Sequence, residues 1–160
     1  MVEPLSVLHY PVGFFDGAAQ GSIGGVGCRI WITQYHFFNL WMGIEDCTNK
    51  CTEIIVLWLC LYWAKYLGIT DFRIMGDSKV VIKWFNHKAG IHSILLQPWC
   101  RTIQDIIIHF NSLTVQHIYR ENNMDADRLS KRGIGGQMGL LHFEELLGTP
   151  FIRTGQLQLF

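Results

Sequence analysis

The sequence predicts an α/β domain built on a mixed five-stranded sheet with helices on both faces. Three observations carry this prediction: three strand-like segments come first, helix-like and strand-like segments then alternate, and glycine or polar residues separate them. The chain has 160 residues, of which 49% are hydrophobic, and this suits one core rather than two. The first three strands would be antiparallel, and the last two would run parallel to the first.

The opening third of the chain predicts an antiparallel meander. Residues 12–16 form the first expected strand, and the glycine-rich stretch 17–27 is expected to turn into a second strand over residues 26–33. Residues 35–44 are rich in aromatic and β-branched side chains, which favour a third strand. No helix is expected before residue 48.

A long helix is expected over residues 54–67. Polar residues 48–53 offer capping side chains ahead of it, and Gly68 is the first helix-breaking residue after it. The segment is apolar almost all round, which is typical of a helix buried on several sides. The alternative is a helix that presents a face to a partner.

The middle of the chain predicts a fourth strand at residues 72–76 and a short helix at residues 78–86. A longer helix is expected at residues 94–110, provided that Pro98 lies in its first turn, where no backbone hydrogen bond is lost. Residues 113–119 alternate in polarity and form the fifth expected strand.

A last helix is expected from Asn123 or Met124 to Arg132, because glycines follow directly. Residues 1–135 would form the domain. Residues 136–160 would be an extension, partly helical or flexible, with a short helix within residues 139–148.

Charge and hydropathy limit the classes of function. Thirteen basic and thirteen acidic residues give zero formal charge, so affinity for nucleic acid would be modest and would depend on local geometry. The longest apolar run, residues 54–64, is shorter than the roughly 20 residues that cross a bilayer, so no membrane crossing is expected. The N-terminus lacks the pattern of a secretion signal, which favours an intracellular setting, nuclear or cytoplasmic.

The five cysteines are scattered through apolar sequence, which favours reduced thiols that fill the core. Cys47 and Cys51 invite a zinc hypothesis. No second cysteine or histidine pair follows at the usual ligand spacing, so that hypothesis is disfavoured.

Four acidic residues lie where expected strands or helices end or begin: Asp16, Glu53, Asp77 and Asp127. Ligands gather at strand ends near the middle of such sheets. Hard divalent cations prefer oxygen ligands, and two of them about 4 Å apart can stabilise both the attacking and the leaving oxygen of phosphodiester hydrolysis. The pattern therefore predicts a two-metal nuclease site.

Four segments, in their order along the chain, resemble the ribonuclease H family, most closely the type I domains of plant retrotransposon-derived sequences. They are FFDGAAQG at residues 14–21, Thr48 and Asn49 ahead of Glu53, GDS at residues 76–78, and HIYRENNMDADRLS at residues 117–130. The resemblance covers residues 12–133 and implies the RNase H-like fold.

The resemblance implies hydrolysis of the RNA strand of RNA/DNA hybrids, leaving 3′-hydroxyl and 5′-phosphate ends, with two Mg²⁺ ions for which Mn²⁺ can substitute. Asp16 would bridge both ions. Glu53 and Asp77 would hold the ion nearer the leaving group, and Asp77 with Asp127, rather than Asp125, would hold the ion that activates water. Four crowded carboxylates repel one another strongly unless cations neutralise them, which agrees with this assignment.

The resemblance also implies contacts with the substrate. Backbone groups of Gly17 and Ala18, together with Asn49, would contact the hybrid, in which the 2′-hydroxyl distinguishes RNA from DNA. Thr48 matches a threonine that binds a phosphate of the DNA strand, and a helix-capping hydroxyl is an equal alternative.

Three further positions carry expectations of substrate binding. Ser22 stands where the family often has asparagine. Lys79 stands where glutamine is common, and it could meet a phosphate or simply be a solvated helix charge. Asn123 could donate a hydrogen bond near the metal ligands, cap the last helix, or do both.

Two departures from the family bear on affinity and rate. Residues 120–123 contain no histidine at the place where many members carry a mobile one. No basic, tryptophan-bearing protrusion is evident between Trp84 and Trp99, so affinity for long hybrids should be low. A reverse transcriptase or another protein would then supply affinity for the nucleic acid.

Other classes of function remain open from the sequence. Neutral charge, six tryptophans and the apolar helix favour a catalytically weak or inactive RNase H-like module that binds nucleic acid or protein. The presence of all four carboxylates argues for activity. An integrase core or a proofreading exonuclease would share the sheet and the acidic cluster, but the contexts of Thr48 and Asp127 argue against both.

Overall fold

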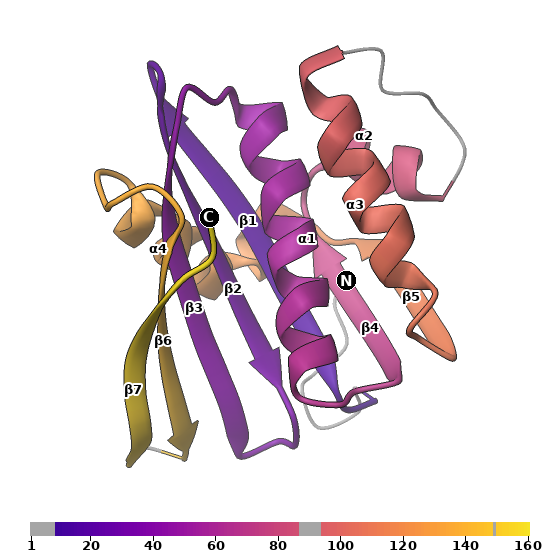
Figure 1. The fold of residues 1–160 in the computed structure, drawn as a ribbon. Helices are drawn as coiled ribbons and strands as arrows, with labels where there is room; N and C mark the ends of the chain where they lie inside the picture. The colour runs from indigo at the N-terminus through magenta and orange to yellow at the C-terminus, as the bar shows by residue number, and fades with distance from the viewer. Residues whose placement is uncertain (1–8, 87–93, 149) are drawn as a thin grey trace.

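A seven-stranded mixed sheet carries the fold (Figure 1), and its strands lie in the order β5-β4-β1-β2-β3-β6-β7. A computed structural model describes residues 9–86, 94–148 and 150–160. The strands are β1 (Val12–Gln20), β2 (Ile23–Trp31), β3 (His36–Glu45), β4 (Asp71–Gly76), β5 (Ser112–His117), β6 (Leu140–Leu147) and β7 (Phe151–Gln158). The helices are α1 (Asn49–Tyr66), α2 (Lys79–Phe85), α3 (Gln97–Ile107) and α4 (Met124–Gly133), with 3₁₀ turns at Ile94–Leu96 and Arg120–Asn122.

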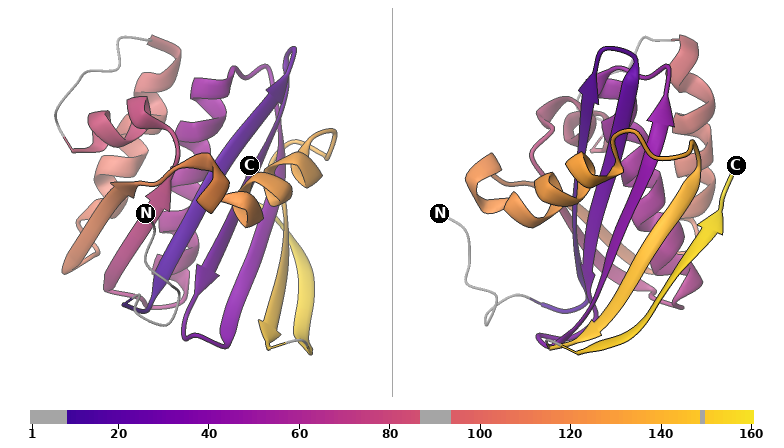
Figure 2. Two further views of the ribbon diagram at one scale, coloured as in Figure 1. Left: turned by 180° about the vertical axis from the view of Figure 1, so that it is seen from behind. Right: turned by 90° about the vertical axis from the view of Figure 1, so that its left-hand side faces the viewer.

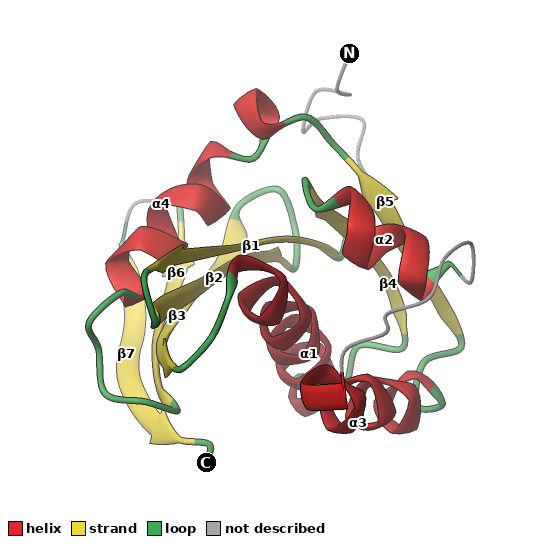
Figure 3. Cartoon of the chain, turned by 90° about the horizontal axis from the view of Figure 1, so that it is seen from above, coloured by secondary structure: helices red, strands yellow, loops and turns green. Residues whose placement is uncertain are grey.

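The pairing of the first five strands confirms the predicted topology. β1, β2 and β3 form an antiparallel meander. β4 runs parallel to β1, and β5 runs parallel to β4. Helices cover both faces, with α1 on one face and α4 on the other (Figure 2; seen from above in Figure 3).

The prediction of five strands is wrong, as is the expectation of a helical or flexible segment after residue 136. β6 pairs antiparallel with β3, and β7 pairs antiparallel with β6. Two residues of β6 face the core: Leu141 is fully buried, and the centre of the Phe143 ring lies 5.1 Å from that of Trp63. Residues two apart lie on the same face of a strand, as these two do. The expected domain boundary at residue 135 stays a prediction.

The glycine-rich stretch 17–27 is not one long turn. β1 continues to Gln20, and the turn occupies only residues 21–22 before β2 begins. Two glycines of β2 lie directly beneath α4: a Cβ on Gly25 would lie 2.6 Å from the Ile134 nitrogen, and one on Gly27 would lie 2.6 Å from the Leu129 Cβ. These glycines permit close packing of a helix on a strand, a use that the sequence pattern does not distinguish from a turn.

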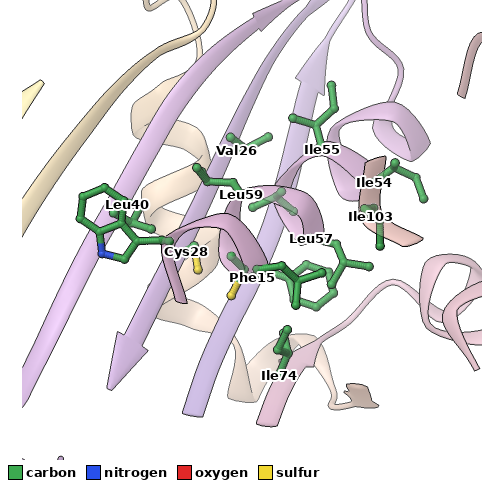
Figure 4. Packing of buried hydrophobic residues seen from close by; sticks show 14 of the residues in the cluster. Phe15, Val26, Cys28, Leu40, Ile54, Ile55, Leu57, Leu59, Ile74 and Ile103 are labelled. Carbon is green, nitrogen blue, oxygen red and sulfur yellow. The ribbon is translucent and has the colours of Figure 1, made fainter. Parts of the chain in front are cut away.

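Helix α1 lies in the core, as expected for an apolar helix. Its residues pack between the sheet and α3, and Leu57 and Leu59 of α1 belong to one buried cluster with Phe15 of β1 and Ile103 of α3 (Figure 4). The helix begins at Asn49, earlier than expected, because the Thr48 side chain caps it by accepting a hydrogen bond from the Cys51 nitrogen at 3.3 Å.

Two cysteines differ from the expectation of reduced thiols. Cys47 precedes the cap of α1 and Cys51 lies in its first turn, and the two form a disulfide with their Cα atoms 5.4 Å apart. The other three cysteines, Cys28, Cys60 and Cys100, are free and buried, as expected for core-filling thiols.

Some expectations concern residues outside the described ranges. The expectation that the chain lacks a basic protrusion concerns largely residues 87–93. The expectation that it lacks a secretion signal concerns residues 1–8. Within the described ranges, no helix combines the length and the hydropathy needed to cross a bilayer.

Candidate active site

Parallel pairing of the inner strands β1 and β4 brings two carboxylates together at the carboxyl end of that pairing. Phe15 pairs with Gly76, so Asp16 and Asp77 each follow a paired residue in neighbouring strands. Asp16 is only 2% exposed. The structure confirms that these two side chains meet, at the point where β4 and its parallel pairing with β1 end, although β1 itself continues to Gln20.

Glu53 reaches the same place from the beginning of α1. Three carboxylate oxygens, one from each of Asp16, Glu53 and Asp77, all lie within 4.8 Å of one another. The Gly17 nitrogen donates to Asp16 Oδ1 at 2.9 Å and to Glu53 Oε1 at 3.2 Å. A Cβ on Gly17 would lie 2.7 Å from the Thr52 Cβ, so glycine lets α1 approach β1 this closely.

Burial disfavours the charged forms of the carboxyl groups in this cluster. Loss of hydration raises the pKa of Asp16 to about 6, and the charges of Asp77 and Asp127 act in the same direction. Burial, with the neighbouring Asp16 carboxylate, holds the pKa of Glu53 well above its usual range. Glu53 Oε2 is buried and has no hydrogen-bond partner among the residues that the structure describes. An oxygen in this position is suited to a cation.

Asp127 lines the same pocket but stands apart from the group of three. The pocket has a volume of about 430 Å³, and α4 contributes both Asp127 and Lys131 to its lining. Lys131 Nζ lies 3.0 Å from Asp127 Oδ2. Asp125, which the sequence analysis left out of the site, instead pairs with Arg29 at 2.9 Å and with Arg128 at 2.6 Å.

Asn123 is buried behind the carboxylates. Its side-chain nitrogen donates to the Phe15 carbonyl at 3.0 Å and to Asp77 Oδ2 at 3.4 Å. Its side chain makes no capping hydrogen bond to α4, although the residue stands at the cap position. Of the two expected roles, the structure shows the hydrogen bond to a carboxylate of the cluster and not the cap.

The remaining candidates for substrate binding divide into two groups. Gly17, Ala18 and Asn49 line the pocket beside the carboxylates. The lining contributed by the described residues does not include Ser22, Thr48 or Lys79. Their roles in substrate binding stay predictions, whereas the alternative role of Thr48 as the cap of α1 is observed.

Local structure explains why these three positions lie apart from the pocket. Ser22 is in the β1–β2 turn, where its carbonyl accepts from the Cys47 nitrogen at 3.3 Å. Thr48 lines a neighbouring pocket with Cys51 and Trp99. Lys79 begins α2 and is exposed.

Among the described residues, the pocket lining includes three cationic side chains that the sequence pattern did not predict: Lys50, Arg120 and Lys131. Arg120 Nε lies 3.9 Å from Asp77 Oδ2, and its side chain is largely exposed. The four-residue spacing of Asp127 and Lys131 on an expected helix was a usable signal, because residues at i and i+4 are neighbours on a helix surface. Nothing in the pattern marked Arg120.

The sheet topology and the carboxylate cluster define an RNase H-like domain, and solved structures share this fold. RNase H1 from the archaeon Halobacterium salinarum superposes with a TM-score of 0.70 and 22% identity, covering 77% of this chain and 96% of that one. The N-terminal RNase H domain of a Mycobacterium tuberculosis protein has a TM-score of 0.69 and 22% identity, covering 77% of this chain and 97% of that one. LC11-RNase H1, solved in complex with an RNA/DNA hybrid, has a TM-score of 0.71 and 21% identity, covering 77% of this chain and 95% of that one.

A family model described as reverse transcriptase-like matches residues 14–133. The chain therefore belongs to this family of ribonuclease H domains. No curated protein matches the chain. The match ends before β6, so the last two strands lie beyond the part that defines the family.

Proposed function

We propose that the protein is a metal-dependent endonuclease that hydrolyses the RNA strand of RNA/DNA hybrids. The observation that carries the proposal is the tight group formed by Asp16, Glu53 and Asp77, in which a buried Glu53 oxygen has no hydrogen-bond partner within the described ranges. The family and the fold favour nucleic-acid hydrolysis. LC11-RNase H1, which shares the fold, binds an RNA/DNA hybrid.

The donor set fits hard divalent cations, because all of its ligands are carboxylate oxygens. Asp16, Glu53 and Asp77 would hold one Mg²⁺, and Asp16 and Asp77 with Asp127 would hold a second, with Mn²⁺ as a substitute. Bound there, the ions would lower the pKa of water and neutralise the charge that develops on the phosphate.

The chain itself would orient the substrate around these carboxylates. Lys50, Arg120 and Lys131 line the pocket and would bind phosphate oxygens. Gly17 and Ala18 belong to β1 at the pocket wall, so their backbone groups can approach the hybrid closely. Asn123 would fix the orientation of Asp77 through the hydrogen bond that it already donates.

The setting of this activity belongs to the same proposal. The chain has zero formal charge, so a reverse transcriptase or another protein would supply affinity for long hybrids. A retrotransposon origin and an intracellular location, nuclear or cytoplasmic, remain expectations from the sequence.

Cleavage of a labelled RNA/DNA hybrid in Mg²⁺ and in Mn²⁺ tests the proposal. Asp77→Asn should reduce cleavage by at least about 100-fold. Asp71→Asn is the matched control, since Asp71 is an exposed aspartate at the other end of the same strand. It should cleave like the wild type.

Duplexes of RNA alone and of DNA alone should stay intact. Folded protein that binds hybrid but does not cut it would replace the proposal with that of an inactive binding module. Trimming of DNA ends would indicate an exonuclease instead.

A further inference from the structure

The fourth carboxylate is held away from the other three. Asp127 lines the pocket, yet the group whose oxygens lie within 4.8 Å of one another comprises Asp16, Glu53 and Asp77. Asp127 is instead paired with Lys131, at 3.0 Å. The site is therefore complete for one cation and incomplete for a second.

Helix α4 is packed tightly on the sheet. Its backbone already touches β2 at Gly25 and Gly27, and a Cβ on Gly133 would lie 3.1 Å from the Met42 nitrogen of β3. With α4 held in this way, a change of the Asp127 side-chain rotamer would bring its carboxylate toward Asp77. Lys131 opposes that change.

The pair between Asp127 and Lys131 is suited to release. The Lys131 side chain is 65% exposed and the Asp127 side chain 19% exposed. Exposed pairs at this helical spacing are weak, and a lysine ammonium on its flexible stem can exchange one anionic partner for another. Lys131 and Asp127 both line the pocket. A phosphate that entered the pocket would therefore come within reach of Lys131.

We propose that Lys131 is a positioning residue that withholds Asp127 from the second cation site until a nucleic-acid phosphate takes its place. In the free protein Asp127 stays with Lys131, and only the site of Asp16, Glu53 and Asp77 is ready. When a phosphate pairs with Lys131, Asp127 turns toward Asp77 and completes the second site. This inference rests on the proposed function and assigns the order in which its site is assembled.

Counting of bound Mn²⁺ by electron paramagnetic resonance on the free protein tests this order without any cleavage. Wild type should bind one ion well and a second poorly. Lys131→Met should bind the second ion about tenfold more tightly, because one positive charge beside a divalent site is lost and Asp127 is freed. Lys131→Arg should restore the wild-type isotherm.

Arg128→Met is the matched control. Arg128 is exposed on the same helix and pairs with Asp125, outside the pocket. The control should leave the Mn²⁺ isotherm unchanged. Titration with a short uncleavable hybrid should raise the wild-type count to two ions, and Asp127→Asn should hold it at one.

Identical isotherms for wild type and Lys131→Met would overturn the role of Lys131, as would equal tightening by Arg128→Met, which would indicate a general effect of charge. Hybrid cleavage by a protein with either outcome would leave the proposed function intact. A protein that bound no Mn²⁺, with or without hybrid, would overturn both.

Discussion

Asp16 and Glu53 lie in a pocket whose burial disfavours the negative charges that a metal site needs. Both side chains are nearly inaccessible, and a backbone nitrogen donates to each of them. One donor shared between two carboxylates does not replace the lost hydration. The free protein therefore carries a cost in stability at this position that a bound cation removes.

The pKa of Asp16 predicts how stability of the metal-free protein varies with pH. Because the folded-state pKa is raised from 3.8 to about 6, the stabilising contribution of the protonated carboxyl is complete below pH 3.8 and is lost as pH rises through 6. The free energy of unfolding should fall by about 2–3 kcal/mol over this rise in pH. Urea unfolding of wild type and of Asp16→Asn in a chelator, from pH 4 to 8, measures it.

Asp16→Asn should remove this part of the pH dependence, so the variant should be the more stable protein at pH 8 without metal. Mg²⁺ or Mn²⁺ should stabilise wild type at pH 8 and stabilise the variant much less. The prediction would be contradicted if, between pH 4 and 8, the free energy of unfolding of wild type fell no more than that of the variant.

Asn123 joins β1 to the Asp77 carboxylate through a buried amide. Asn123→Ala should lower the free energy of unfolding by about 1–3 kcal/mol, because the Phe15 carbonyl loses its donor. Asn122→Ala, at an exposed position next to it, is the control and should be nearly neutral. Chemical unfolding of both variants checks this, and equal stabilities would contradict it.

The sequence identified residue types at the site better than their roles. Asp16, Glu53 and Asp77 lie together as expected, although the expected strand end at Asp16 was wrong, because β1 continues to Gln20. The helix-cap signal at Asn123 was misleading, since a buried side chain found partners far away in the sequence, at Phe15 and Asp77. Local sequence does not contain such long-range contacts.

At the scale of elements, the packing of α4 on β2 sets the place of the fourth carboxylate. Gly27→Ala should destabilise the protein by about 1–3 kcal/mol, because the added methyl group would meet the backbone of α4 and no flexible side chain can yield. It should also weaken binding of the second Mn²⁺ ion in the presence of hybrid, since α4 carries Asp127.

Gly136→Ala is the milder control, because the nearest atom to its added Cβ would be the Gly133 oxygen at 3.2 Å. Thermal unfolding and Mn²⁺ counting on both variants test this prediction. If Gly27→Ala is no less stable than Gly136→Ala, the close packing is not what holds α4 in place.

The glycine-rich stretch shows where pattern and structure diverge at this scale. Glycine favours turns because it tolerates a positive φ, and Gly21, with φ of 63°, fits that use. Gly25 and Gly27 are selected for lack of volume instead. The two uses give the same letter in the sequence, so only the position of a distant helix separates them.

At the scale of the whole molecule, the hairpin of β6 and β7 is an integral part of the sheet. Leu141→Ala should lower the free energy of unfolding by about 2–4 kcal/mol, because Leu141 is fully buried in the main core. Leu147→Ala is the control at the other end of the same strand, where the side chain is 53% exposed, and it should cost little. Chemical unfolding would contradict this if the two variants lost equal stability.

The first five strands were predictable because each has its own apolar run and its own breaker. The last two were not, since residues 140–158 mix acidic, basic and apolar side chains. Their charges find partners only in three dimensions: Glu144 pairs with Arg132 of α4, and Glu145 pairs with both His36 of β3 and Arg153 of β7. The contact with His36 links the hairpin to β3, the pair with Arg132 links it to α4, and the pair with Arg153 joins its own two strands.

The contact between α4 and the sheet also divides the chain into positions of different evolutionary freedom. A substitution in the apolar core is absorbed by neighbouring side chains, which can repack and leave the backbone where it was. Gly25 and Gly27 have no such buffer, because any side chain there translates directly into displacement of a helix. In a library of random variants that keep the site intact, these two positions should be among the last to vary, although neither contributes an atom to it.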